Sequence, residues 1–116
     1  MQKKITVVML GVRNMDRAVR FYRSVLKLPL KFQTPDYSEF KTGGAVLALE
    51  KRKKVAATGA SITLPTRNIR RDRQALIRHK VKFWKPLHRE AYGWVMMPKD
   101  SEGNIFEIVQ YAKLGK

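Results

Sequence analysis

Apolar and polar positions along the chain follow two rhythms, one typical of strands and the other of helices. Residues 4–11 form a β-branched apolar run that predicts a buried strand. From Met15 to Leu26 apolar residues recur at helical spacing with arginines on the other side, which predicts an amphipathic helix capped by Asn14. Further strands are predicted at residues 30–34, 37–41 and 45–50.

The second half of the chain repeats this order. The segment Val12-Arg13-Asn14-Met15 has a counterpart in Thr66-Arg67-Asn68-Ile69, and both follow an apolar run. A second helix is expected from Ile69, followed by a strand at residues 81–84 and a loop through Pro86 and His88. The other strands are predicted at residues 59–65, 92–97 and 105–111. Each half therefore reads as strand, helix and three strands, which indicates an internal repeat.

Length and composition indicate one folded domain. The 116 residues, 44% of them hydrophobic, suffice for one core. We expect a single domain 1–116, with module one at 1–52, a basic connector at 53–58 and module two at 59–116. No apolar run reaches the roughly 20 residues of a membrane span, and no signal peptide is evident, so we expect a cytoplasmic protein without membrane contact. The chain has no cysteine, which excludes disulfides, thiolate catalysis and sulfur-ligated zinc.

The charge is strongly positive, with 25 Lys and Arg against 9 Asp and Glu. Such a surface attracts anions, so some affinity for polyanions is expected. The cations are spread along the sequence, and no pattern of a common nucleic-acid module is present. We therefore do not expect nucleic acid as the physiological partner, although a basic module that binds nucleic acid or an acidic partner stays open as an alternative.

Four short segments carry a resemblance to a known family. They are Val12-Arg13-Asn14-Met15 with Ala18 and Phe21-Tyr22, then Val25 to Leu30, then Tyr92-Gly93-Trp94-Val95, and finally Asp100-Ser101-Glu102-Gly103-Asn104-Ile105-Phe106-Glu107-Ile108. In these segments the chain resembles the vicinal oxygen chelate superfamily of glyoxalase, bleomycin-resistance and dioxygenase proteins. The resemblance implies an α+β fold of two tandem βαβββ modules, whose curved mixed sheets form a cup. It also implies a homodimer.

Catalytic members of this superfamily hold a divalent metal with one side chain from the first and last strands of each module. By the internal alignment these positions hold Val7, Ala48, Ser61 and Glu107. Only Glu107 is an ordinary metal ligand, because valine and alanine cannot coordinate and a serine hydroxyl is a poor neutral donor. A slip of one residue would bring in Thr6 and a slip of two Glu50, still without a histidine. We therefore expect no metal and no cofactor.

The same positions define a predicted ligand site. Alternation along residues 105–109 sends Glu107 to the face opposite Phe106 and Ile108, so a helix packed on those two would leave Glu107 in the cup. Trp94 is the predicted stacking residue, and His88 is expected at the rim. The complete predicted ligand-binding set is Val7, Met9, Ala48, Ser61, Thr63, His88, Trp94 and Glu107.

These observations favour a metal-free protein that binds a small molecule, like the bleomycin-resistance branch that the chain resembles. The positive charge favours an anionic or neutral ligand, and the lining favours an aromatic or apolar one. The alternative is a divergent enzyme, a lyase or dioxygenase of the vicinal oxygen chelate type, with Glu107 as its catalytic base or weak metal anchor.

Overall fold

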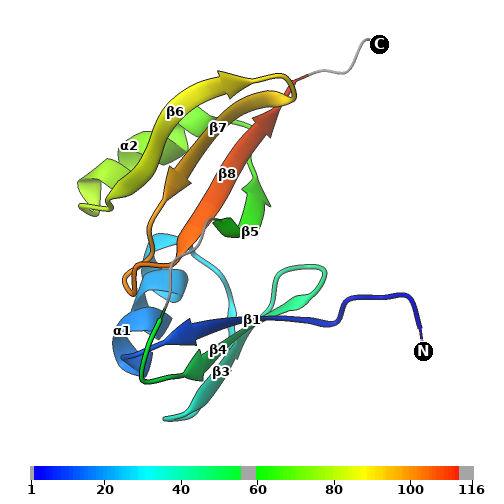
Figure 1. Cartoon of the computed structure of the whole chain (residues 1–116), viewed down its shortest axis with the longest axis vertical. Helices are drawn as coiled ribbons and strands as arrows, with labels where there is room; N and C mark the ends of the chain where they lie inside the picture. Colours follow the sequence, from blue (N-terminus) through cyan, green and yellow to red (C-terminus); the bar gives the residue numbers. More distant parts are fainter. Residues whose placement is uncertain (1, 56–59, 113–116) are drawn as a thin grey trace. The chain divides into compact units, whose positions relative to one another are not determined.

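A computed structural model describes residues 2–55 and 60–112 of the chain, with side chains from Ile62 onward in the second range. The contacts divide the chain into two compact units, Met1–Val55 and Ala56–Lys116. Each unit contains one four-stranded sheet (Figure 1). Residues 56–58 of the predicted connector lie outside the described residues. No helix within the described ranges is long and apolar enough to cross a membrane.

The first unit follows the predicted order of strand, helix and three strands. Its sheet has the strand order β1-β4-β3-β2, with β1 parallel to β4 and the other neighbours antiparallel. Its elements are β1 (Val7–Val12), α1 (Met15–Arg20), the π-helical turn η1 (Phe21–Val25), β2 (Leu30–Gln33), β3 (Tyr37–Phe40) and β4 (Val46–Lys51).

The second unit repeats the same topology. Its sheet has the order β5-β8-β7-β6, and β5 and β8 form the parallel pair. Its elements are β5 (Ala60–Pro65), α2 (Ile69–Arg78), β6 (Phe83–Glu90), β7 (Gly93–Pro98) and β8 (Ile105–Tyr111). The predicted α+β fold of two βαβββ modules is therefore confirmed.

The repeated segment has a structural cause in both units. The Asn14 side chain accepts a hydrogen bond from the backbone N–H of Arg17 at 3.0 Å, and Asn68 accepts one from Arg71 at 3.1 Å. Each asparagine thus satisfies a backbone donor that the first helical turn leaves unpaired. The sequence repeat marks the place where a parallel strand ends and the covering helix begins.

In each unit the helix covers one face of the sheet. Ser38 of β3 donates to the sulfur of Met15 in α1 at 3.2 Å, and the rings of Tyr22 and Phe40 lie 6.0 Å apart. In the second unit the backbone N–H of Ile69 at the start of α2 donates to the Gln110 side chain at 2.8 Å. Strand alternation then assigns every other residue to the opposite face.

The prediction of a loop through Pro86 and His88 is wrong, because both residues belong to β6. This strand runs from Phe83 to Glu90 and lies at the edge of its sheet. The register shifts between Lys85 and His88, so Pro86 sits at an irregularity. A proline has no N–H to donate, and an edge strand with a bulge tolerates that loss. His88 consequently lies in a strand, paired with Val95.

Candidate functional site

Glu107 lies in the middle of β8, on the face of the second sheet opposite α2. Gln110, which contacts α2, shares the other face with Phe106 and Ile108, in agreement with the predicted alternation. Thr63 is the partner of Glu107 in the parallel ladder, and its hydroxyl donates to Glu107 Oε1 at 3.1 Å. The Tyr92 hydroxyl donates to Oε2 at 3.1 Å. Each carboxylate oxygen therefore has a hydroxyl donor.

Two tyrosine rings accompany this carboxylate. Tyr92 and Tyr111 have ring centroids 6.4 Å apart and are 42% and 60% exposed. Desolvation and the hydrogen bond to Glu107 raise the pKa of Tyr92 above its ordinary value of 10.0. The predicted ligand-binding set includes neither ring, although the alternation of positions 107, 109 and 111 already indicates a shared face for Tyr111. A carboxylate beside accessible aromatic surface suits a small ligand with an apolar body and a polar donor.

His88 projects from β6 on the same side of the sheet as Val95, the face of Glu107. Its Nδ1 lies 2.8 Å from the Pro86 carbonyl oxygen, and its Nε2 lies 2.8 Å from Glu90 Oε2. Both neighbours are acceptors, so the ring satisfies them only when both nitrogens carry protons. Both hydrogen bonds raise the pKa of His88 above 6.5, and the bond to the Pro86 carbonyl has the larger effect. The geometry suits a cationic imidazolium rather than a general base.

Trp94 does not share this face, and the expectation that it lines the ligand site beside Glu107 is wrong. It is paired with Gln110, which contacts α2, so its ring lies on the helix side of the sheet. There it is within cation–π distance of Arg70 in α2 and Arg89 in β6. The sequence pattern gave no register for β7 against β8, and one residue of register reverses the face.

In the first unit Val7, Met9 and Ala48 lie on one face of the sheet. Met9 is paired with Ala48 as Thr63 is with Glu107, so the internal alignment of Ala48 with Glu107 agrees with the register. Val7 and Met9 are 42% and 41% exposed, whereas Ala48 is buried. Three predicted residues are thus brought together here, and they offer only an apolar surface.

A second tyrosine–carboxylate pair lies on that face and was missed from the sequence. The Tyr37 hydroxyl donates to Glu39 Oε2 at 2.5 Å, and Lys31 Nζ lies 3.4 Å from Glu39 Oε1. The hydrogen bond to Glu39 raises the pKa of Tyr37, and the same bond chiefly lowers the pKa of Glu39. Their spacing of two residues in a strand was the available signal.

The donors at the family metal positions do not fit a divalent ion. Val7 and Ala48 carry no ligand atom, and Glu107 is engaged by two hydroxyl groups. Ser61 lies in β5, and its side chain is outside the described residues. Within the described ranges no three His, Asp or Glu side chains cluster at metal-binding distance.

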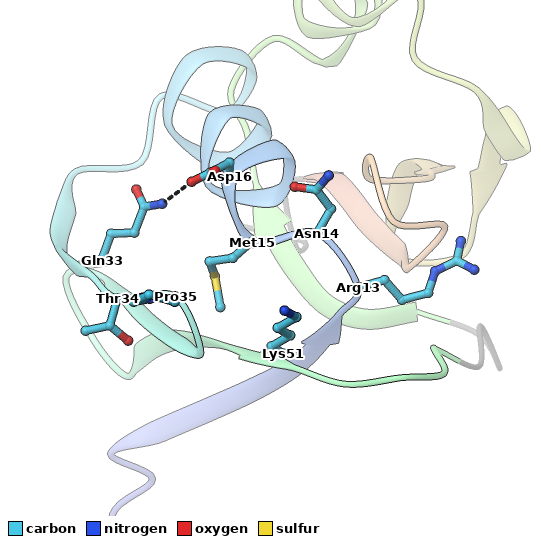
Figure 2. A pocket seen from close by; sticks show the side chains of 8 residues that line it. All are labelled: Arg13, Asn14, Met15, Asp16, Gln33, Thr34, Pro35 and Lys51. Atoms are coloured by element: carbon cyan, nitrogen blue, oxygen red, sulfur yellow. Dashed lines mark hydrogen bonds between the residues drawn. The ribbon is translucent and has the colours of Figure 1, made fainter.

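A separate pocket of about 580 Å³ lies in the first unit, at the start of α1. Figure 2 shows Gln33 and Asp16 joined by a hydrogen bond of 2.8 Å on one side, and Lys51 on β4 below Met15. Six of its eight lining residues are polar or charged, so it offers hydrogen-bonding groups to a polar solute. None of the predicted site residues lines it; the lining residues are Arg13, Asn14, Met15, Asp16, Gln33, Thr34, Pro35 and Lys51.

Comparison with known proteins shows that most of the chain matches one family. Residues 4–108 match the family model described as Glyoxalase/Bleomycin resistance protein/Dioxygenase superfamily. No curated protein matches the chain significantly.

Solved structures with the same fold include both enzymes and binding proteins. Lactoylglutathione lyase from Agrobacterium tumefaciens has a TM-score of 0.77 at 18% identity, with 94% of each chain covered. TnmS3, an antibiotic binding protein from Streptomyces sp. CB03234, has a TM-score of 0.79 at 17% identity, with 96% of this chain and 98% of TnmS3 covered. TioX from Micromonospora sp. ML1 has a TM-score of 0.76 at 17% identity, with coverages of 93% and 98%. Identities this low establish a shared fold and leave the ligand to be argued from the residues.

Proposed function

The chain belongs to the Glyoxalase/Bleomycin resistance protein/Dioxygenase superfamily, and we propose that it is a metal-free binding protein for a small neutral or anionic aromatic molecule. The observation that carries this proposal is the arrangement around Glu107, where one carboxylate is held by Thr63 and Tyr92 beside the Tyr111 ring. Such a site binds an aromatic body on the tyrosines and accepts one hydrogen bond from the ligand.

Electrostatics supports the neutral or anionic class. The formal net charge of +16 creates a positive potential that attracts anions and repels cations. On the same face of the sheet, the hydrogen bonds of His88 favour an imidazolium. At the site, a cationic ligand would meet this positive field with the Glu107 carboxylate, which already accepts two hydroxyl hydrogen bonds.

The family contains both enzymes and binding proteins, and the donor set favours binding. Thr63 and Tyr92 hold Glu107 as a hydrogen-bond acceptor, with one hydroxyl on each carboxylate oxygen. The antibiotic-binding role of TnmS3 is compatible with the proposal, and the ligand class is taken here from the residues of this chain alone.

We also expect the chain to form a homodimer, which sedimentation velocity measures.

A thermal-shift screen of small molecules tests the proposed class, with matched sets of anionic, neutral and cationic aromatic compounds. We expect neutral or anionic aromatics to raise the melting temperature and the cationic set to leave it unchanged. Affinities of the best compound are then measured by calorimetry. Stabilisation by cationic compounds alone, or by none of the sets, would contradict the proposal.

Variants locate the site. Tyr111→Ser should weaken the best compound roughly three- to tenfold, the range expected for one aromatic contact. Ile77→Ser, which removes an apolar side chain that is 48% exposed on α2, is the matched control and should have no effect. Lys51→Gln tests the pocket of Figure 2 instead. A loss with Lys51→Gln and none with Tyr111→Ser would move the ligand to that pocket.

Metal analysis separates the proposal from the enzyme alternative. The protein is incubated with Mn²⁺, Ni²⁺ or Zn²⁺, desalted and assayed by elemental analysis. We expect no stoichiometric metal, because a single carboxylate gives a weak and unoriented site. Stoichiometric metal that is lost in Glu107→Ala would instead favour a lyase or dioxygenase with Glu107 as its metal anchor.

A further inference from the structure

Two guanidinium groups converge on one indole ring on the helix side of the second sheet. The Arg70 guanidinium of α2 lies 5.1 Å from the centroid of the Trp94 ring, and that of Arg89 in β6 lies 5.6 Å from it. Arg89 and Trp94 are also opposite each other in the β6–β7 ladder. Both arginines are exposed and Trp94 is half-buried, so this cluster is accessible. We name these three residues the Trp94 cluster.

The positive charge of the Trp94 cluster is not neutralised within the described residues. No ion pair there involves Arg70 or Arg89, and the Arg89 side chain donates only to the backbone oxygen of Glu90. The acidic residues nearest to these arginines in the sequence are Asp72, which accepts a hydrogen bond from the Thr66 hydroxyl, and Glu90, whose carboxylate lies 2.8 Å from His88 Nε2. Two like charges therefore share one ring without a carboxylate between them, and an anion placed there gains charge-assisted hydrogen bonds from both.

The position of the arginines on α2 also favours a bound anion. Arg70 and Arg71 lie in the first turn, where the positive end of the helix dipole disfavours cations. Arg73 follows Arg70 by three residues, so two like charges are neighbours on the helix surface. Both arrangements cost stability in the free protein, and a bound anion removes the cost. The sequence shows these cations as dispersed, whereas the fold places Arg89 beside Arg70 through the ring of Trp94.

We propose that the Trp94 cluster binds the phosphodiester backbone of single-stranded nucleic acid. Planar guanidinium groups match the geometry of phosphate oxygens and can bind them in bidentate fashion. Both guanidinium groups lie over the indole, so an unpaired base would stack on the ring in place of one of them, and the displaced guanidinium would bind the adjacent phosphate. A duplex offers no unpaired base for this exchange. This site lies on the face of the sheet opposite Glu107, so it is independent of the proposed small-molecule function.

Binding is tested by fluorescence anisotropy with labelled oligothymidylate of about 15 nucleotides. We compare the wild type with the double variant Arg70→Gln/Arg89→Gln and with Arg20→Gln/Arg23→Gln, which removes the same charge from α1 and η1. The first pair should lose about tenfold in affinity and lower the slope of log affinity against log salt by about 1.4, or 0.7 for each phosphate contact. The control should lose less than about twofold, because general attraction depends on net charge.

Two further readouts protect the test against a folding defect. Circular dichroism checks each variant, and Arg70→Lys/Arg89→Lys keeps both charges while removing the planar groups. We expect the lysine variant to retain the salt slope but to bind roughly threefold more weakly. In a Trp84→Phe background, where Trp94 is the remaining tryptophan, binding should change its fluorescence.

Three outcomes would overturn the proposal. An equal loss in the two glutamine variants would mean diffuse attraction to the whole basic surface. Tighter binding of a duplex than of the single strand would remove the role of base stacking. Competition by polyglutamate as effective as that by oligothymidylate would replace nucleic acid with an acidic polypeptide as the partner.

Discussion

At the scale of single residues, hydroxyl and carbonyl neighbours decide what each ionisable group of the second sheet can do. Glu107 is bound by Thr63 and Tyr92, and His88 lies between the carbonyl of Pro86 and the carboxylate of Glu90. Glu107 is held as a hydrogen-bond acceptor and His88 as a hydrogen-bond donor. Both therefore contribute recognition and local stability, and both have consequences that pH titration measures.

The first consequence concerns Tyr92. Its pKa is raised by desolvation and by Glu107, so Glu107→Gln, which removes the negative charge, should bring it back toward 10.0. Absorbance titration of the phenolate band measures the change, with Tyr92→Phe to assign the signal. Because the pKa is raised on folding, the associated stability is present below pH 10.0 and is lost as pH rises through the raised value. An unchanged titration in Glu107→Gln would contradict this coupling.

The second consequence concerns His88, whose pKa is raised above 6.5. Its stabilising contribution is fully present below 6.5 and should disappear as pH rises through the folded-state pKa. Glu90→Gln should lower the pKa of His88 by removing one of its acceptor charges. Proton NMR of the imidazole follows the titration, and His79→Asn identifies which signal belongs to His88. A pKa of His88 at or below 6.5 in the wild type would be inconsistent with the geometry.

At the scale of the elements, sequence pattern predicted nearly every strand and helix because both units repeat one periodicity. Asn14 and Asn68 marked the two helix starts correctly, and β8 has the predicted bounds Ile105–Tyr111. The prediction of a loop within β6 failed for a physical reason. A proline such as Pro86 usually indicates a loop in a sequence, but an edge strand tolerates it. Edge position is a property of the sheet and is invisible in one strand.

The candidate site was predictable only in part for the same reason. Alternation within β8 placed Glu107 correctly against Phe106 and Ile108, because a single strand carries that information. It failed for Trp94, whose face depends on the register of β7 against β8. The hydroxyl partner Tyr92 was predicted inside a strand at residues 92–97, where alternation would place it on the face of Trp94, but β7 begins at Gly93 and Tyr92 lies outside it.

Gly93, at the start of β7, lies close to the backbone of β8 and gives a third prediction. Gly93 has a φ of +146°, and a Cβ there would lie 2.2 Å from the backbone oxygen of Gln110. Gly93→Ala should therefore separate the start of β7 from β8 and destabilise the protein by about 2 kcal/mol or more. Urea denaturation measures this, with Gly44→Ala as control because a Cβ at Gly44 meets no atom within 4 Å. Equal stability of the two variants would refute the close approach.

At the scale of the whole molecule, the net charge of +16 acts on every encounter and does not by itself select a site. Its field reaches about 30 Å at 0.01 M salt and about 8 Å at 0.15 M. Ligands of one charge class are therefore gathered or repelled before any side chain touches them. Selectivity must then come from local groups such as the Glu107 and Tyr111 pair or the Trp94 cluster.

This separation of long-range and local effects predicts distinct kinetics for two aromatic probes. The association rate of anionic anilinonaphthalene sulfonate should fall about tenfold or more between about 0.01 and 0.15 M salt, because screening removes electrostatic steering. The neutral probe phenylnaphthylamine should change little. Stopped-flow fluorescence measures both, and Tyr111→Ser should raise the dissociation rate of either probe while leaving the salt dependence of association intact. If both probes showed the same salt dependence, the positive field could not be what selects ligands by their charge. The selection would then rest on the residues of the site alone.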